Sequence, residues 1–159
     1  IGHSNGGRIA FSFAKKYPER VARLILIDSA GIYHNELPIR LKRFIFRNLA
    51  KIGKRFTTSE VLRKFIYKLA REGDYKNATP AQRQTMLNLI HQDLTPILSQ
   101  VKFPTLIIWG KDDTITPLSD GELMHKLIKK SKMKIINGAK HSPQFTHVKE
   151  VVKEVYEYL

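Results

Sequence analysis

Three short apolar runs, each ending at turn-forming residues, are the feature that most limits what this chain can fold into. The runs cover Arg23–Ile27, Pro104–Trp109 and Met133–Ile136. Apolar runs of this length, bounded by turn residues, predict strands that are covered on both faces. Helical patterns before and after the runs, over residues 5–17, 117–130 and 144–159, make strands and helices alternate along the chain. This alternation predicts an α/β fold in which a parallel sheet is flanked by helices.

A basic segment interrupts the alternation after the first predicted strand. Between Pro38 and Lys76 there are twelve Lys or Arg residues against three Asp or Glu, so this segment contributes +9 to a net charge of +14. Apolar residues recur within it at spacings of three and four on both sides of Thr57–Ser59, which predicts two basic amphipathic helices. A third helix is predicted from Pro80 to about Leu94, with Thr79 as its cap.

Composition excludes several classes of protein. The longest apolar runs have four residues, whereas a membrane-spanning helix needs about 20. The chain has no cysteine, which excludes disulfides, thiolate metal sites and cysteine catalysis. No secretory signal is visible, so the expected compartment is the cytoplasm. Because the chain begins at Ile1 without a methionine, we interpret it as the C-terminal part of a longer protein.

The first residues carry a motif with a defined chemistry. Gly2-His3-Ser4-Asn5-Gly6-Gly7 fits the G-x-S-x-G nucleophile elbow, in which a serine lies on a strained turn that leads into a helix. The flanking glycines, Gly2 and Gly6, are expected to let the backbone pack closely around Ser4. The backbone N–H of Asn5 would then face a reacting oxygen. On the motif alone, a plain turn before a helix is the competing interpretation.

The order of residues along the chain favours the catalytic interpretation. An elbow serine is followed later in the sequence by an acid and then by a histidine. Asp113 follows the second apolar run and His141 follows the third. Both therefore lie at the carboxyl ends of predicted strands, at the sheet edge where open α/β sheets bind ligands. Because a nucleophilic serine needs a base and the base needs a carboxylate, the pattern predicts a triad of Ser4, His141 and Asp113.

With these motifs in order, the sequence resembles the C-terminal part of an α/β-hydrolase superfamily protein with a helical cap. The resemblance implies core segments at residues 1–30 and 101–159 and an all-helical cap at 31–100. It places the acid at the fourth position of a Gly-x-x-Asp turn, which is Asp113 rather than Asp112. It also implies that the protein needs no cofactor and no metal site.

Other candidate residues remain open at this point. Asp112 is the nearest rival for the acid and is expected to face solvent. Asp28 also follows a predicted strand, where some members of the superfamily place their acid. The side chain of His3 is expected to diverge from the nucleophile, which leaves it a role beside the triad or in the pocket. The remaining histidines are expected at surface or packing positions; they are His34, His91, His125 and His147.

A serine nucleophile favours hydrolysis of carboxylic esters, here of small or medium apolar substrates. The alternatives are a lactonase or a hydrolase of carbon–carbon bonds, although relatives that cleave ring-fission dienones often have tryptophan directly after the histidine and this chain has Ser142. In another class, the basic helices of a non-catalytic scaffold would bind an anionic membrane or nucleic acid. No nucleic-acid motif is recognisable, so the expected partner is a small ester-like molecule.

The resemblance also implies that part of the site lies upstream of this chain. In the superfamily, a second oxyanion donor comes from a loop that precedes the elbow. Losing one such donor typically costs about 10²- to 10³-fold in rate. The chain by itself is therefore expected to be inactive.

Overall fold

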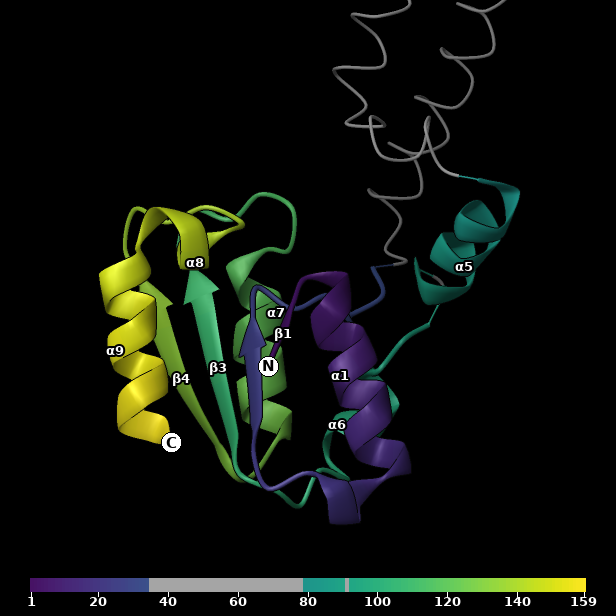
Figure 1. Ribbon diagram of the computed structural model, residues 1–159, viewed down its shortest axis with the longest axis horizontal. Coiled ribbons are helices and arrows are strands. Elements are labelled where there is room, and N and C mark those ends of the chain that lie inside the picture. Colours follow the sequence, from purple (N-terminus) through teal and green to yellow (C-terminus); the bar gives the residue numbers. More distant parts are fainter. Residues whose placement is uncertain (35–78, 91) are drawn as a thin grey trace, which may run out of the picture. The chain divides into compact units, whose positions relative to one another are not determined.

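The computed structural model describes residues 1–34, 79–90 and 92–159 (Figure 1). The chain divides into two compact units, residues 1–33 with 89–159 and residues 34–88. The two basic helices predicted between Pro38 and Lys76 lie outside the described residues, as does His91. Every strand described below belongs to the first unit.

The first unit is built on a parallel sheet of four strands. They are β1 (Gly2–His3), β2 (Leu24–Ile27), β3 (Thr105–Gly110) and β4 (Ser131–Ile136), in the order β1-β2-β3-β4. Neighbouring strands pair in parallel throughout. The three apolar runs of the sequence thus become β2, β3 and β4, and the α/β class with a parallel sheet is confirmed. Among the described strands, β1 pairs with β2 alone.

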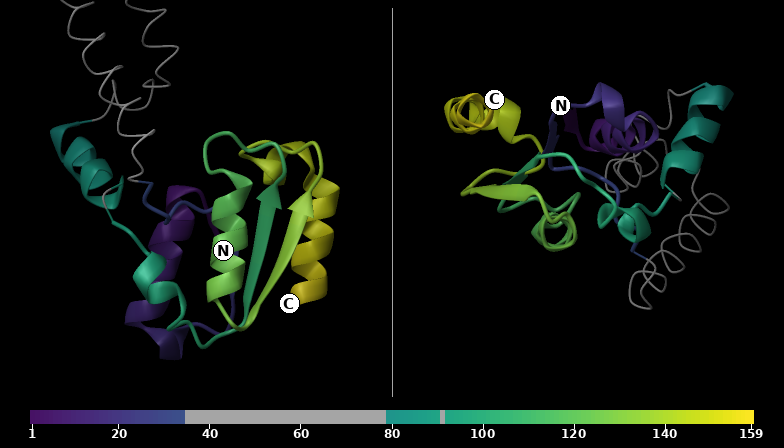
Figure 2. Two further views of the ribbon diagram at one scale, coloured as in Figure 1. Left: turned by 180° about the vertical axis from the view of Figure 1, so that it is seen from behind. Right: turned by 90° about the horizontal axis from the view of Figure 1, so that it is seen from below.

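Alternate residues of the strands pack against helices on opposite faces of the sheet. On one face, Leu26 and Ile107 pack with Phe11 of α1 (Asn5–Lys16) and Met124 of α7 (Leu118–Leu127). On the other face, Ile25, Ile27, Leu106 and Ile108 pack with Val151 of α9 (Val148–Tyr158). Figure 2 shows α7 and α9 on the two sides of β3 and β4. Since helices cover both faces, β2 and β3 in the middle of the sheet are buried along their whole length, and their residues are mainly apolar.

Three helix boundaries differ from the predicted ones. The expected helix at 144–159 is two helices, α8 (Pro143–Thr146) and α9, because the backbone of His147 leaves the helical region (φ −130°, ψ 50°). The helix predicted to reach Leu94 is α5 (Pro80–Ile90), and Leu94 instead precedes α6 (Thr95–Leu98). The helix predicted to reach residue 130 ends at Leu127. A short 3₁₀ helix, η1 (Pro18–Arg20), follows α1.

No helix among the described residues has the length and apolarity to cross a bilayer.

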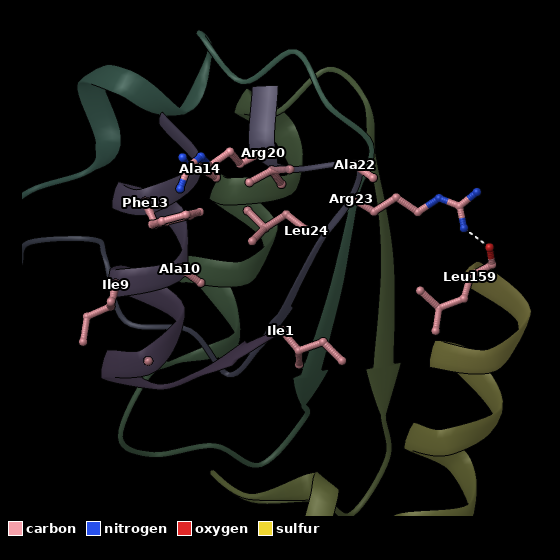
Figure 3. A pocket seen from close by; sticks show the side chains of 12 residues that line it. Ile1, Ile9, Ala10, Phe13, Ala14, Arg20, Ala22, Arg23, Leu24 and Leu159 are labelled. Carbon is pink, nitrogen blue, oxygen red and sulfur yellow. Dashed lines mark hydrogen bonds between the residues drawn. The ribbon is translucent and has the colours of Figure 1, made fainter. Parts of the chain in front are cut away.

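A hollow of about 830 Å³ lies beside β1 and α1 (Figure 3). Apolar side chains line much of it, among them Ile1, Ile9, Phe13, Leu24 and Leu159. No residue of the loops that follow β3 and β4 contributes to its wall. The hollow is therefore separate from the sheet edge where the sequence places the catalytic groups.

Candidate active site

Ser4 lies in the tight turn between β1 and α1, in a strained backbone conformation. Its φ of 53° and ψ of −124° are uncommon for a residue with a side chain. Hydrogen bonds hold it there: its N–H donates to the Ile27 carbonyl at 3.1 Å, and its carbonyl accepts from the N–H groups of Gly7 at 3.0 Å and Ala30 at 2.9 Å. A strained serine at a strand-to-helix turn is the geometry of a nucleophile elbow.

The glycines of the turn are not equivalent. A Cβ on Gly2 would lie 2.5 Å from the Gly6 carbonyl oxygen and 2.6 Å from the Gly7 Cα, so this position requires glycine. A Cβ on Gly6 would meet nothing within 4 Å, so the expected crowding at Gly6 is wrong. The crowded position is instead Gly7, which was not selected from the sequence. A Cβ added at Gly7 would lie 2.7 Å from the Ser29 Cβ.

The loops after β1, β3 and β4 bring Ser4, Asp113 and His141 into one hydrogen-bonded line. His141 Nε2 lies 3.0 Å from Ser4 Oγ, and His141 Nδ1 lies 2.7 Å from Asp113 Oδ2. An ionised Asp113 can only accept, so Nδ1 carries the proton and Nε2 is free to accept from the serine hydroxyl. This arrangement can remove a proton from Ser4.

Asp113, not Asp112, is the carboxylate that meets His141. Burial raises the pKa of Asp113, but hydrogen bonds from Thr116, His141 and Ile115 outweigh burial and hold that pKa below its usual value. Thr116 Oγ donates to Asp113 Oδ2 at 2.6 Å, and the Ile115 N–H donates to Oδ1 at 2.7 Å. The side chain of Asp112 is exposed. Thr116 was not selected from the sequence, although the Asp-x-x-Thr spacing is typical of such a turn.

The predicted oxyanion donor, Asn5, is the first residue of α1. The first N–H groups of a helix have no carbonyl of a preceding turn to bond, and the helix dipole favours negative charge beside them. The backbone N–H of Asn5 is therefore suited to an oxyanion that forms next to Ser4.

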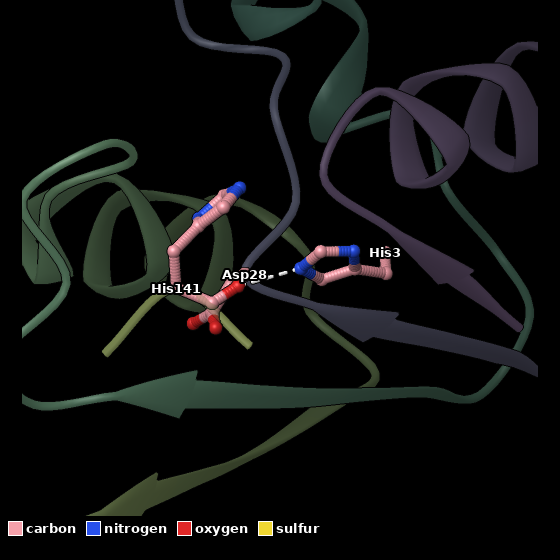
Figure 4. Close-up of side chains that lie close together, drawn as sticks. All are labelled: His3, Asp28 and His141. Carbon is pink, nitrogen blue, oxygen red and sulfur yellow. Dashed lines mark hydrogen bonds between the residues drawn. The ribbon is translucent and has the colours of Figure 1, made fainter. Parts of the chain in front are cut away.

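Two further side chains, His3 and Asp28, lie close to His141 at this edge (Figure 4). His3 Nε2 lies 2.6 Å from the backbone carbonyl of His141, and the two imidazole rings are 4.9 Å apart. Asp28 is fully buried, with a φ of 40°, and its Oδ1 accepts from the Gly110 N–H at 2.8 Å. The pKa of Asp28 is raised to about 6, chiefly by burial and to a smaller extent by nearby Asp113, while the hydrogen bond from Gly110 and the charge of His141 act to lower it.

The same three residues contain donor atoms that a metal ion could use. One such atom from each lies within 4.8 Å of the other two. However, both ring nitrogens of His141 are hydrogen-bonded to the triad partners, and His3 Nε2 bonds the His141 carbonyl. A metal ion here would have to take His141 out of the triad. The sequence offered no signal for this cluster, because its members are far apart along the chain.

Two other histidines, His125 and His147, make hydrogen bonds to residues outside the triad. His125 Nδ1 lies 2.8 Å from Ser131 Oγ, in an exposed pair. His147 Nδ1 lies 2.9 Å from Thr146 Oγ, also at the surface.

Comparison with known proteins assigns the fold a family. The alpha/beta hydrolase fold family matches residues 1–148. The chain belongs to this family. It is 25% identical over 165 residues to a 2-hydroxy-6-oxo-6-phenylhexa-2,4-dienoate hydrolase of Burkholderia cepacia, covering 92% of this chain and 57% of that protein. It is 28% identical to Lipase 1 of Psychrobacter immobilis, covering 89% of this chain and 49% of that protein.

A solved structure also resembles the chain. A thermophilic esterase from Thermogutta terrifontis superposes with a TM-score of 0.63 at 26% identity, covering 99% of this chain and 62% of the esterase. The chain thus spans about half to three fifths of the length of these relatives. What the relatives share, by their names, is hydrolysis.

Proposed function

We propose that the protein carrying this chain is a serine hydrolase that cleaves carboxylic esters of small or medium apolar substrates. The observation that carries the proposal is the hydrogen-bonded line from Ser4 Oγ through His141 to Asp113. The strained elbow supports it, because the turn holds the hydroxyl beside His141. The lipase and the esterase among the similar proteins support it as well.

The chemistry follows from the positions of the atoms. Ser4 Oγ attacks the ester carbonyl while His141 Nε2 takes the hydroxyl proton, and Asp113 stabilises the imidazolium that forms. The Asn5 N–H donates to the oxyanion. His141 then gives its proton to the leaving alcohol, which leaves an acyl group on Ser4. A water molecule, deprotonated by His141, releases the acid and restores the serine.

Hydrolysis of a carbon–carbon bond is the second candidate. It is favoured by the similarity to the Burkholderia cepacia dienoate hydrolase over 92% of this chain. Ser142 directly after His141 argues against it, since hydrolases that cleave ring-fission dienones often have tryptophan at this position. A lactonase would use the same triad as an esterase.

Labelling with a fluorophosphonate probe tests the nucleophile. The complete protein should be labelled, and Ser4→Ala should abolish both labelling and ester hydrolysis, because only an activated hydroxyl attacks such a probe at neutral pH. Ser119→Ala removes an exposed serine away from the triad and is the matched control. Equal labelling of the Ser4→Ala protein would refute the assignment.

Substrate preference separates the two candidate reactions. A series of p-nitrophenyl esters of increasing acyl length should be hydrolysed, with the highest kcat/KM for short or medium chains. A 2-hydroxy-6-oxo-dienoate, the class named in the relative, should be turned over poorly. The reverse preference would favour the carbon–carbon hydrolase.

A further inference from the structure

Asp28 is a buried carboxyl group that the proposed triad does not use. It follows β2 directly, and its side chain is fully buried. Its backbone N–H donates to the Ile108 carbonyl at 3.0 Å, and its own carbonyl oxygen lies 3.2 Å from Thr116 Oγ. One carboxyl oxygen accepts from the Gly110 N–H, while the other, Oδ2, has no partner among the described residues. A buried carboxyl oxygen without a donor is costly, which calls for an explanation.

The groups that face Asp28 are those of the triad and of β1. His141 comes from the loop after β4, Asp113 from the loop after β3, and His3 from β1. A carboxyl oxygen of Asp28 lies within 4.8 Å of a ring nitrogen of both His3 and His141. At this distance in a buried site, a negative charge favours the protonated form of an imidazole and disfavours ionisation of a second carboxyl group.

We propose that Asp28 is a positioning residue of the hydrolase, which holds the end of β3 through Gly110 and stabilises the imidazolium form of His141 by its charge. The proposal rests on the serine hydrolase function proposed above. Within the part of the chain that the structure describes, Asp28 makes no hydrogen bond to His141 or Ser4. Like Asp113, Asp28 affects the reaction by stabilising His141, but it does so by electrostatic attraction over a distance and not by a hydrogen bond.

Asp28 loses its negative charge between about pH 7 and pH 5, the range in which serine hydrolases lose activity on acidification. Burial, together with nearby Asp113, raises the pKa of Asp28 to about 6, so the group is mainly ionised at pH 7 and mainly protonated at pH 5. An ionised Asp28 attracts the positive charge that His141 gains when it takes the proton of Ser4. Removing the Asp28 charge should therefore move the acidic limb of the kcat/KM profile to lower pH.

Asp28→Asn removes the charge and keeps the local geometry. The amide oxygen can still accept from the Gly110 N–H, and asparagine tolerates a positive φ better than most residues. In the complete protein, the acidic midpoint of kcat/KM for a p-nitrophenyl ester should fall by about one pH unit. At pH 8, kcat should fall about tenfold with KM unchanged, because the lost interaction is with the imidazolium and not with substrate.

Asp112→Asn is the matched control, since it removes the same formal charge from an exposed position next to Asp113. Its acidic midpoint should equal that of the wild-type protein, because solvent screens exposed charges. If Asp28→Asn fails to fold, Asp28→Gly also suits the positive φ; it loses the bond from Gly110 as well as the charge, so only its acidic midpoint is compared, and that midpoint should show the same shift. An unchanged midpoint in a folded Asp28 variant overturns the inference.

The fluorophosphonate probe separates this outcome from failure of the proposed function. If wild-type Ser4 is labelled and the Asp28 variants keep the wild-type midpoint, only the role of Asp28 is refuted. If wild-type Ser4 is not labelled at pH 8, the serine hydrolase proposal fails and the role of Asp28 fails with it.

Discussion

Asp112 and Asp113 are adjacent in the sequence but have opposite environments, and this difference gives a sharp test. Asp113 is buried and accepts from His141 at 2.7 Å, whereas Asp112 is exposed. Asp113→Asn should lower kcat by about 10⁴-fold, because the amide stabilises the wrong tautomer of the histidine. Asp112→Asn should stay within about threefold of wild type. Steady-state hydrolysis of a p-nitrophenyl ester measures both, and a reversal of the two effects would identify Asp112 as the acid.

Asp28 should also make stability depend on pH in a direction opposite to that of Asp113. Its pKa is raised to about 6 in the folded protein, so the folded state holds the proton more tightly than the unfolded state. Protonated Asp28 therefore adds to the free energy of unfolding. The full contribution is present below about pH 4 and is lost as the pH rises through 6. The loss is about 3 kcal/mol, since one pKa unit corresponds to about 1.4 kcal/mol.

Urea unfolding of wild-type protein and Asp28→Asn at pH 4 to 7 isolates this contribution. The difference in unfolding free energy, wild type minus variant, should become more negative as the pH rises. The part of the Asp113 contribution that does not depend on Asp28 cancels in the difference, because both proteins retain Asp113; what remains is the contribution of Asp28 with its coupling to neighbouring groups. A difference that is constant with pH would mean that Asp28 titrates alike in the folded and unfolded states.

At the scale of residues, the order of the residues and the strands that they follow predicted which three side chains, Ser4, His141 and Asp113, lie in one hydrogen-bonded line. That order did not predict the approach of His3 and Asp28 to His141. Those contacts depend on how β1, β2 and the loop after β4 meet in space, and no spacing in the sequence records that. The error at Gly6 has a similar cause, since the motif does not say which glycine the backbone of the next segment approaches.

At the scale of elements, the last residue of β3 fixes the loop that carries His141. A Cβ on Gly110 would overlap the Lys140 carbonyl oxygen and would lie 2.6 Å from that of Ala139. Gly110→Ala should therefore displace the backbone next to His141 and lower kcat by about 10²-fold, since a shift of about 1 Å at a catalytic group has that effect. Gly6→Ala, where a Cβ meets no atom within 4 Å, is the control. Equal kcat in the two variants would show that the loop adapts.

Strands and helices were predicted well where they follow from a repeating pattern of apolar residues. Helix ends that depend on a single hydrogen bond or contact were predicted poorly. The apolar runs became β2, β3 and β4 because each is buried between helices. Periodicity could not reveal the break at His147, whose N–H bonds the Pro143 carbonyl and whose carbonyl accepts from the Val151 N–H. Nor could it reveal that the Leu94 N–H bonds the Gly31 carbonyl, far away in the sequence.

At the scale of the whole molecule, the hollow beside β1 leaves a large apolar surface open. The exposed fractions are 74% for Ile1, 54% for Ile9 and 45% for Phe13, and β1 pairs with β2 alone among the described strands. An open strand edge beside apolar side chains favours association with another chain. Residues 1–159, produced by themselves, should therefore self-associate as their concentration rises.

Sedimentation velocity on two double variants of residues 1–159 tests whether this hollow is the cause. Ile9→Lys with Phe13→Lys places two charges in the hollow, and Val148→Lys with Val152→Lys places two on α9, where the valines are 51% and 58% exposed. Both pairs add the same net charge to a chain that already carries +14. The Ile9→Lys, Phe13→Lys pair should weaken self-association about tenfold or more. Burying two apolar side chains of this size on association contributes more than the 1.4 kcal/mol to which a tenfold change corresponds.

The Val148→Lys, Val152→Lys pair should change self-association by no more than about twofold. An equal reduction by both pairs would show that net charge, and not the apolar surface beside β1, controls the association.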